Sequence, residues 1–421
     1  EAGARYFLVP KLKIYEAILF STLSSSKDFH AIEISSVADA ERVLFSNYSE
    51  KFSHAFKPES MKLPQLKPIA MDADLARFSL VAKMVVDGLE RKVKAAFRQE
   101  RVGEEEKVMR DYFASEISKY RSLLSLGYPF SAANSAFLLS IDAEYARLGE
   151  ASMDLDATIE NAKRCADSLQ AARKTKENIH WAIGSDLRRI WSQSKLNETV
   201  EGRPEQSGYT TLRDVLYSYS WCEISQMLGM QAEEIGGEGI DEKELAELAS
   251  QKLARAKEVL EEARRPDYDA LWHYKNGLKA NESGYYGAAI YEAVYAISMQ
   301  EAAFGLQGNL TAICEKLSTS ERKTLWGKIY QGQGAYLYQE AVQSSAPLGD
   351  AYRILKYSQA IDDAAVEIEE RLATNEAAIV EEATSEKTPQ LTYENFAIWA
   401  VLAGAVFALG GLAAFRLARK R

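Results

Sequence analysis

The stretch DLARFSLVAKMVVDGLERKVKAAF (residues 74–97) decides the fold class of this chain. Its apolar side chains recur at steps of three and four residues, which is the period of one face of an α-helix. The members of this stripe are Phe78, Val81, Val85, Leu89, Val93 and Ala96. The segment therefore predicts an amphipathic helix that packs against a core.

The same period continues through most of the chain. Further helices are expected over residues 104–124, 131–148, 155–191 and 212–230. The third of these is long enough that we expect a break near Gly184. A polar loop is expected at 197–208. The predicted fold class is therefore mainly α.

Three glycines, at 236, 237 and 239, predict an interruption of the helical run. Beyond them, Asp241 and Glu244 have the spacing of a capping box, in which each side chain satisfies a free backbone N–H of the first helical turn. The helix that follows should end at Pro266, and four more helical segments are expected up to about residue 379.

One internal unit has the form of a helical hairpin. Gly284 and Tyr285 form the expected turn, with Gly277 seven residues earlier and Ala293 and Ala296 where helices would cross closely. This spacing is similar to a tetratricopeptide hairpin, although the Trp and first-helix Ala positions of that repeat are not matched. Generic helix packing is the alternative. Residues 334–336 predict a second turn of this kind.

The first 45 residues differ from the rest. Arg5 to Val9 and His30 to Ile34 are short runs typical of β-strands, and residues 14–23 and 36–45 are expected to be helical. Strand and helix in alternation predict a parallel α/β unit. Two strands do not make a stable sheet alone, so we expect this unit to be the closing part of a larger domain, and the chain to be a fragment.

The segment Phe396 to Phe415 carries no charged side chain. At about 1.5 Å per residue, its length matches the roughly 30 Å hydrocarbon core of a bilayer. Basic residues follow it and acidic residues precede it, which predicts a single-pass cell-membrane protein with a cytoplasmic tail and an extracytoplasmic body. A buried hydrophobic hairpin element is the alternative.

These patterns predict seven parts. They are an α/β remnant at 1–45, a linker at 46–71, a helical domain at 72–235, a partly tetratricopeptide-like helical domain at 236–380, a stalk at 381–395, a transmembrane helix at 396–415 and a basic tail at 416–421.

The chain has 421 residues, with 51 Lys and Arg against 61 Asp and Glu, a net charge of -10. This balance argues against a nucleic-acid partner, because binding phosphates requires a basic field. Three cysteines, Cys165, Cys222 and Cys314, allow one disulfide, but three buried thiols are the favoured interpretation. Asn-x-Ser/Thr triplets at Asn47, Asn197, Asn281 and Asn309 fit an outward-facing body.

No catalytic, cofactor-binding or metal-binding residue is predicted in this chain. The four histidines, His30, His54, His180 and His273, are far apart in sequence and suggest no metal cluster. The G-x-G at 332–334 is interpreted as a turn, not a phosphate-binding loop. The tyrosines at 285, 286, 291, 295, 336, 338, 352 and 357 favour packing between helices, and a peptide-binding groove is the alternative.

Residues 1–11, EAGARYFLVPK, resemble the closing part of a Lon-type (S16 family) protease domain. That family has an A-G turn, an apolar strand that ends in Pro, a helix, and then a strand and last helix similar to residues 32–34 and 37–40. With the helical body and terminal membrane helix, the architecture resembles the membrane-anchored archaeal Lon-like serine proteases. Residues 14–23 are more apolar than the family's usual connection.

The resemblance implies a Ser–Lys dyad, in which lysine is the base for a serine nucleophile. Both would precede the strand at Arg5 to Val9, so Lys11, Lys13 and residues 24–26 are not candidates and this chain alone should be inactive. The parent would be an endopeptidase without an ATPase module. It would act on polypeptides and could form a homo-oligomer. A membrane-anchored, non-enzymatic helical adaptor for peptides or proteins is the alternative.

Overall fold

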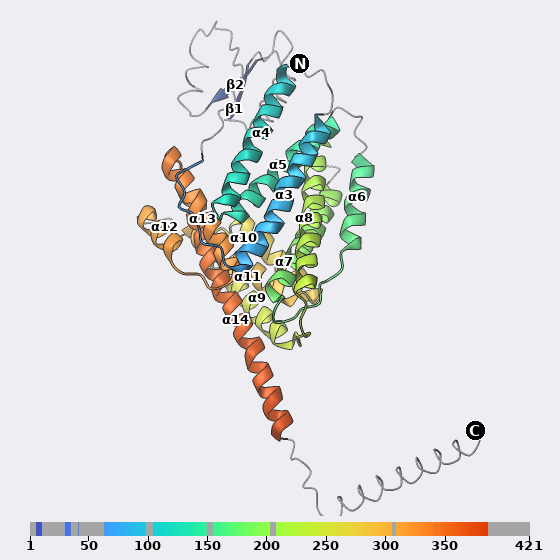
Figure 1. The fold of residues 1–421 in the computed structure, drawn as a ribbon, viewed down its shortest axis with the longest axis vertical. Coiled ribbons are helices and arrows are strands. Elements are labelled where there is room, and N and C mark those ends of the chain that lie inside the picture. The colour runs from blue at the N-terminus through green and yellow to red at the C-terminus, as the bar shows by residue number, and fades with distance from the viewer. Residues whose placement is uncertain are drawn as a thin grey trace, which may run out of the picture. The chain divides into compact units, whose positions relative to one another are not determined.

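The computed structural model describes residues 6–10, 30–34, 41, 63–97, 104–149, 155–202, 208–304 and 309–385. The chain divides into two units, Glu1–Glu369 and Glu370–Arg421. All contacts analysed below lie within the first unit. Figure 1 shows its elements as a ribbon.

The described residues form two strands followed by helices. The strands are β1 (Tyr6–Pro10) and β2 (His30–Ile34). The helices are α3 (Ala73–Ala96), α4 (Glu104–Ser125), α5 (Pro129–Gly149), α6 (Leu155–Ser168), α7 (Ile179–Gly202), α8 (Gly208–Ile235), α9 (Lys243–Glu262), α10 (Tyr268–Glu282), α11 (Tyr286–Phe304), α12 (Leu310–Thr319), α13 (Leu325–Ser344) and α14 (Gly349–Ser385). The prediction of a mainly α fold is confirmed.

The two strands pair in parallel, with Tyr6 opposite His30 and Pro10 opposite Ile34. Both strands and their parallel direction agree with the prediction. The predicted helices at 14–23 and 36–45 fall almost wholly outside the described residues, as do the transmembrane helix at 396–415 and the basic tail. Of the helices that the structure describes, none combines the length and the apolar character needed to cross a membrane.

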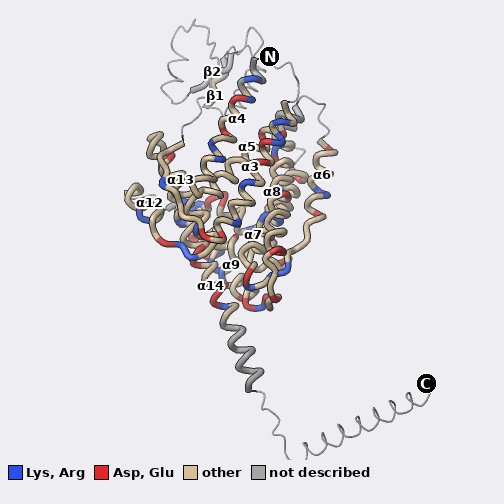
Figure 2. Tube along the Cα trace, in the orientation of Figure 1, with Lys and Arg blue, Asp and Glu red and all other residues tan. Residues whose placement is uncertain are grey.

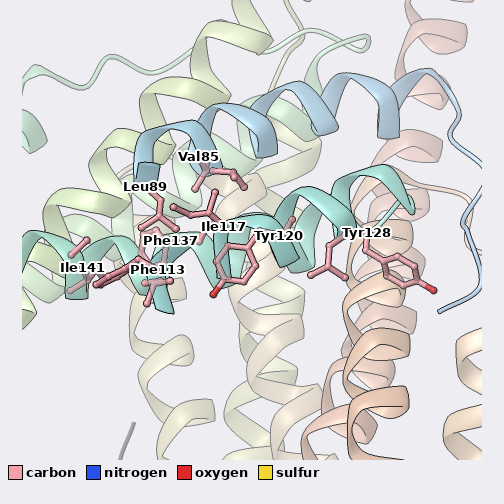
Figure 3. Packing of buried hydrophobic residues seen from close by; sticks show 14 of the residues in the cluster. Val85, Leu89, Phe113, Ile117, Tyr120, Tyr128, Phe137 and Ile141 are labelled. Carbon is pink, nitrogen blue, oxygen red and sulfur yellow. The ribbon is translucent and has the colours of Figure 1, made fainter. Parts of the chain in front are cut away.

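The apolar stripe of α3 is buried from Phe78 to Leu89, as predicted, whereas Val93 and Ala96 near the end of the helix are half-buried. Phe78, Val85 and Leu89 of α3 face the core, and Leu89 is fully buried. Figure 3 shows Val85 and Leu89 beside Phe113 of α4 and Phe137 of α5. Asp72 caps α3 by accepting a hydrogen bond from the Leu75 amide at 2.9 Å, which satisfies one free N–H of its first turn.

Helices α7 and α8 are joined by two reciprocal pairs of serines. Ser185 Oγ donates to the Ser225 carbonyl at 2.8 Å, and Ser225 Oγ donates to the Ser185 carbonyl at 2.9 Å. Seven residues along α7, Ser192 and Ser218 exchange the same two bonds at 2.8 and 2.7 Å. Small side chains on both helices let the backbones approach closely, and α7 becomes buried on most of its faces.

The break predicted near Gly184 is in the wrong place. Gly184 lies inside α7, and the interruption is the segment 169–178 between α6 and α7. Asn178 determines this local structure, because its side chain accepts from the Thr175 amide and donates to the carbonyls of Arg173 and Ala232. A glycine seen in sequence does not reveal whether it serves a turn or a close contact.

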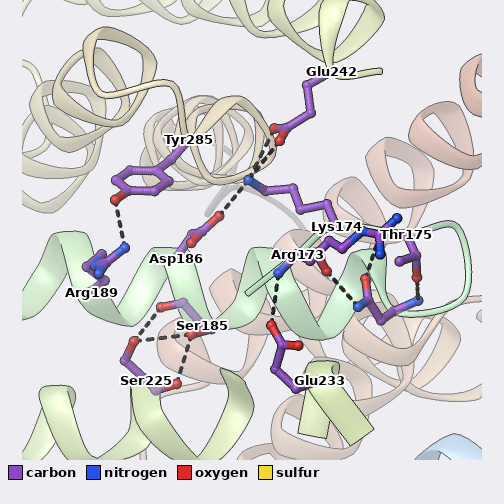
Figure 4. Close-up of polar contacts among 11 residues, drawn as sticks. Arg173, Lys174, Thr175, Ser185, Asp186, Arg189, Ser225, Glu233, Glu242 and Tyr285 are labelled. Atoms are coloured by element: carbon purple, nitrogen blue, oxygen red, sulfur yellow. Dashed lines mark hydrogen bonds and ion pairs between the residues drawn. The ribbon is translucent and has the colours of Figure 1, made fainter. Parts of the chain in front are cut away.

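Figure 4 shows how this segment is tied to its neighbours. The ammonium of Lys174 lies 3.2 Å from the Asp186 carboxylate and 3.1 Å from that of Glu242, so one buried cation joins α7 to the start of α9. Thr175 Oγ1 donates to the carbonyl of Gly236, at the glycine turn. Gly236 and Gly237 have φ of 66° and 115°, which confirms the predicted interruption after α8.

Other local predictions need correction. Residues 197–202 continue α7 instead of starting a loop. The capping box is wrong, because α9 begins at Lys243, whose amide donates to Asp241. Residues 381–385 of the predicted stalk are still helical in α14. The helical hairpin is confirmed as α10 and α11, with Gly284 at φ 78° in the turn.

The glycines at 332 and 334 do not form turns. Both lie inside α13, as does the second turn predicted at 334–336. A Cβ at Gly334 would lie 2.6 Å from Leu355 Cγ, so this glycine allows α14 to pack closely. The predicted domain boundary near residue 235 coincides with the turn between α8 and α9 and stays a prediction.

The expectation of three thiols is wrong for two of the cysteines. Cys165 of α6 and Cys222 of α8 form a disulfide, and Cys314 is a free, buried thiol. The bond ties the short helix α6 to the middle of α8. Sequence spacing gave no indication of this pairing, because the two residues are 57 positions apart.

We predict that Cys222→Ser lowers the free energy of unfolding by about 2–4 kcal/mol, because a long loop is no longer closed in the unfolded chain. Thiol titration under denaturing conditions should give one reactive thiol before reduction and three after it. Cys314→Ser should leave the oxidised chain with no reactive thiol. Three thiols before reduction would contradict the pairing.

Burial raises the pKa of the Asp186 carboxyl to about 6, against about 3.9 in an unfolded chain. Between these values the native state holds a proton that the unfolded state has lost, so stability should fall as pH rises from about 4 to about 6. Asp186→Asn removes this dependence. We expect the unfolding free energy of the wild type, relative to this variant, to decrease across that window. A difference in unfolding free energy between the wild type and this variant that stays constant with pH would contradict the raised pKa of Asp186.

Candidate functional site: an aromatic groove

Seven helices of the first unit, α5, α7, α8, α10, α11, α13 and α14, surround a groove of about 760 Å³. Its volume lies within the roughly 300–1,000 Å³ that is typical of ligand pockets. The lining side chains come from positions between Phe130 and Ile354. The groove is therefore a product of the tertiary fold.

Aromatic rings form much of its wall. Trp191 and Trp221 meet edge to face with ring centroids 4.7 Å apart, and Tyr217 lies 5.8 Å from Trp221. Phe130 of α5 and Tyr330 of α13 also line the groove, with ring centroids 4.7 Å apart. Such a wall offers large apolar contacts at little cost in side-chain entropy.

Hydrogen bonds fix the orientation of several rings. The buried carboxylate of Glu292 accepts from Trp191 Nε1 and lies 2.5 Å from His273 Nδ1. Trp272 Nε1 donates to Glu198 at 2.9 Å. Tyr295 stacks on His273 and donates to Asp269 at 3.1 Å, and burial holds the pKa of the Tyr295 hydroxyl well above its usual value. The wall is thus organised without a ligand.

The guanidinium of Arg188 is a buried cation in the lining of this groove. Only 2% of its surface is exposed. Its Cζ lies 4.7 Å from the ring centre of Trp326, 4.9 Å from that of Trp191 and 5.7 Å from that of Trp221. The faces of aromatic rings attract a cation, by about 2 kcal/mol or more where water is excluded.

Arg188 has no carboxylate partner among the described residues, and its Nε and Nη1 have no hydrogen-bond partner there. The next residue differs, because Arg189 donates to the Tyr285 hydroxyl at 2.7 Å. Burying an ion without full compensation costs several kcal/mol. Arg188 is therefore a strong donor with unused capacity, located where a ligand could enter.

Most other charges at the groove have partners of their own. Lys195 lies 3.1 Å from Asp214, and Arg353 lies 3.2 Å from Asp267. Figure 2 shows Lys and Arg interspersed with Asp and Glu along the helices of this unit. Arg213 also lines the groove and is half-buried, so Arg188 is distinguished from the other cations there by its nearly complete burial.

The position of Trp326 depends on Gly184. Trp326 is fully buried and its Nε1 donates to the carbonyl of His180 at 2.8 Å. A Cβ on Gly184 would collide with the Trp326 ring. Gly184 precedes Arg188 by one helical turn, so this glycine lets the ring reach the guanidinium.

The histidines and tyrosines noted in the sequence have different surroundings in the structure. His273 lies in the groove wall, whereas His180 bonds the Tyr291 hydroxyl at 3.0 Å. The described residues contain no cluster of side chains suited to a metal ion. The tyrosines at 291, 336, 338, 352 and 357 are buried, which confirms packing between helices for these five. Tyr295 instead contributes to the groove.

Sequence reasoning missed Arg188 and its three tryptophans. An arginine within a helical pattern is usually solvated, and only the tertiary fold reveals that this one is buried. Trp191, Trp221 and Trp326 are three of only six tryptophans in the chain, and that scarcity was the one signal available.

We predict that Gly184→Ala lowers the free energy of unfolding by about 1–3 kcal/mol, because the added methyl must displace a packed indole. Gly88→Ala is the matched control in α3, since its Cβ would meet only Arg91 Nη2 at 3.7 Å. That change should stabilise the chain by about 0.5–1 kcal/mol. Chemical denaturation measures both. Equal effects of the two substitutions would rule out the close contact.

The function of this site has to be argued from its chemistry, because a fold alone does not determine function. Comparison with known proteins gives no match for this chain among family models, curated proteins or solved structures.

Proposed function

We propose that the helical body is a polypeptide-binding module and that the aromatic groove is its binding site. The observation that carries this proposal is the groove of about 760 Å³ with a wall of pre-oriented aromatic rings. Aromatic side chains bind apolar segments of many sequences, and the polar atoms beside them fix a backbone. Of the residues that line the groove, Tyr268 is exposed and Trp272 is partly exposed, so both can contact an incoming polypeptide.

We further propose that the parent of this chain is a membrane-tethered, Lon-like serine endopeptidase of the S16 family, and that the body presents polypeptides to it. The parallel pairing of β1 with β2, at the residues that carry the resemblance, supports this proposal. The disulfide between Cys165 and Cys222 favours an oxidising compartment, as an extracytoplasmic body requires. Phe396 to Phe415 would be the membrane anchor.

A non-enzymatic adaptor is the competing proposal, and the groove supports it equally. The coding sequence before Glu1 distinguishes the two. A G-x-S-A-G-like turn followed by a lysine is expected for the peptidase. An upstream region that lacks the turn and the lysine would leave the adaptor as the remaining proposal.

The groove is tested by binding of reduced, carboxymethylated α-lactalbumin, a permanently unfolded polypeptide, to the full chain. We expect Trp272→Ala to weaken binding by about tenfold, which corresponds to about 1.4 kcal/mol, because it removes an apolar wall. Fluorescence anisotropy of the labelled polypeptide measures this.

Leu80→Ala is the control, because Leu80 is an apolar side chain of α3 that is 61% exposed and does not line the groove. It should leave the affinity unchanged. Equal weakening by the two substitutions, or no binding by the wild type, would reject the groove as the site.

A further inference from the structure

Arg188 is the one feature of the groove that an apolar binding surface does not explain. Its side chain is almost fully buried, lines the groove, and leaves Nε and Nη1 without a hydrogen-bond partner among the described residues. Three indole rings surround it at 4.7–5.7 Å. Rings attract a cation but accept no hydrogen bond in the plane of the guanidinium, so the donors stay unused.

The geometry points to a carboxylate as the missing partner, and we infer that Arg188 receives the C-terminal carboxylate of a bound polypeptide. This inference rests on the proposed function and names the part of the polypeptide that the groove recognises. Arginine presents its N–H donors in a planar fork that matches a carboxylate, often with two parallel hydrogen bonds. An anion here would also neutralise a buried charge.

The size of the groove favours a chain terminus over an acidic side chain within a longer chain. The groove has the volume of a small-ligand pocket, about 760 Å³, which suits a chain end better than a segment that enters and leaves. The buried Oε1 of Gln333 lines the same groove and also has no hydrogen-bond partner among the described residues. Any bound backbone offers an N–H for such an acceptor, so Gln333 supports binding of a polypeptide at this place without distinguishing its end from its middle.

Several other charged groups of the groove already have partners within the chain. Asp269 and Glu198 already accept hydrogen bonds from Tyr295 and Trp272. The carboxylate of Asp214 is paired with Lys195. Arg213 and Asp350 also line the groove, but Arg213 is half-buried, whereas Arg188 is almost fully buried with two unused donors.

Three synthetic peptides test the inference on the full chain. The first is acetyl-Ala-Ala-Leu-Leu-Phe with a free C-terminal carboxylate, the second is the same peptide as its C-terminal amide, and the third is an amide with Glu in place of the second Leu. Tryptophan fluorescence reports binding, because indoles surround the site. We expect the free acid to bind about tenfold or more tighter than both amides.

Arg188→Gln should remove the preference for the acid, so that acid and amide bind alike. Arg188→Lys keeps the charge but lacks the fork, and should retain only part of the preference. Arg255→Gln is the charge-matched control, because this arginine of α9 is exposed and does not line the groove, and the variant should bind as the wild type does. Circular dichroism checks that each variant is folded.

The outcomes separate this inference from the proposed function. If the wild type binds acid and amide equally well, Arg188 is a structural cation and the inference fails while the groove proposal stands. If the Glu-containing amide binds as tightly as the acid, the site takes a side-chain carboxylate and the C-terminal assignment fails. If no peptide binds while carboxymethylated α-lactalbumin does, the inference fails and the groove proposal stands; if neither binds, both proposals fail. The comparison of acid with amide needs only the wild type, so it holds even where a variant does not fold.

Discussion

The close contact of α7 with α8 is the constraint on which the rest of the first unit depends. Ser185 with Ser225, and Ser192 with Ser218, exchange hydrogen bonds between side chain and backbone across the helix pair. This contact leaves α7 covered on most of its faces by its neighbours. A polar group on such a helix must find a partner, since burying one without a hydrogen bond is costly.

The polar side chains of α7 meet that requirement in different ways. Asp186 is paired with Lys174, and Arg189 bonds to Tyr285. Arg188 is compensated by indole rings instead of by acceptors, and it lies in the lining of the groove. Hydrogen bonds to Glu292 and Glu198 fix the rings of Trp191 and Trp272, and fixed rings would lower the entropy lost in the binding that we propose.

The sequence was sufficient for features that follow from local periodicity. The stripe from Phe78 to Ala96 predicted α3, and the alternation of Gly, Tyr and Ala around Gly284 predicted the hairpin of α10 and α11. Prediction from the sequence failed where one residue type serves two structural purposes, as glycine does in turns and in close contacts between helices. Gly184 and Gly334 suggested breaks, yet each allows a large neighbour, Trp326 or Leu355, to approach a helix.

The candidate site was the least predictable part, because it depends on which buried faces meet. Nothing near Arg188 in sequence reveals that Trp326, on another helix, covers its guanidinium. The Cys165–Cys222 bond is of the same kind, since it joins distant helices. The parallel pairing of β1 and β2 was predictable because strand-like and helix-like segments alternate over the first 45 residues, which favours that arrangement.

Photo-cross-linking tests the central claim, that polypeptide binds in the aromatic groove, most directly. A peptide with benzoylphenylalanine next to a free C-terminus is irradiated with the full chain, and the attachment sites are located by mass spectrometry. Cross-links to α7, α8 and α13 around Arg188, lost on competition with the unlabelled acid, are predicted. Cross-links that spread over other helices and persist under competition would contradict the account.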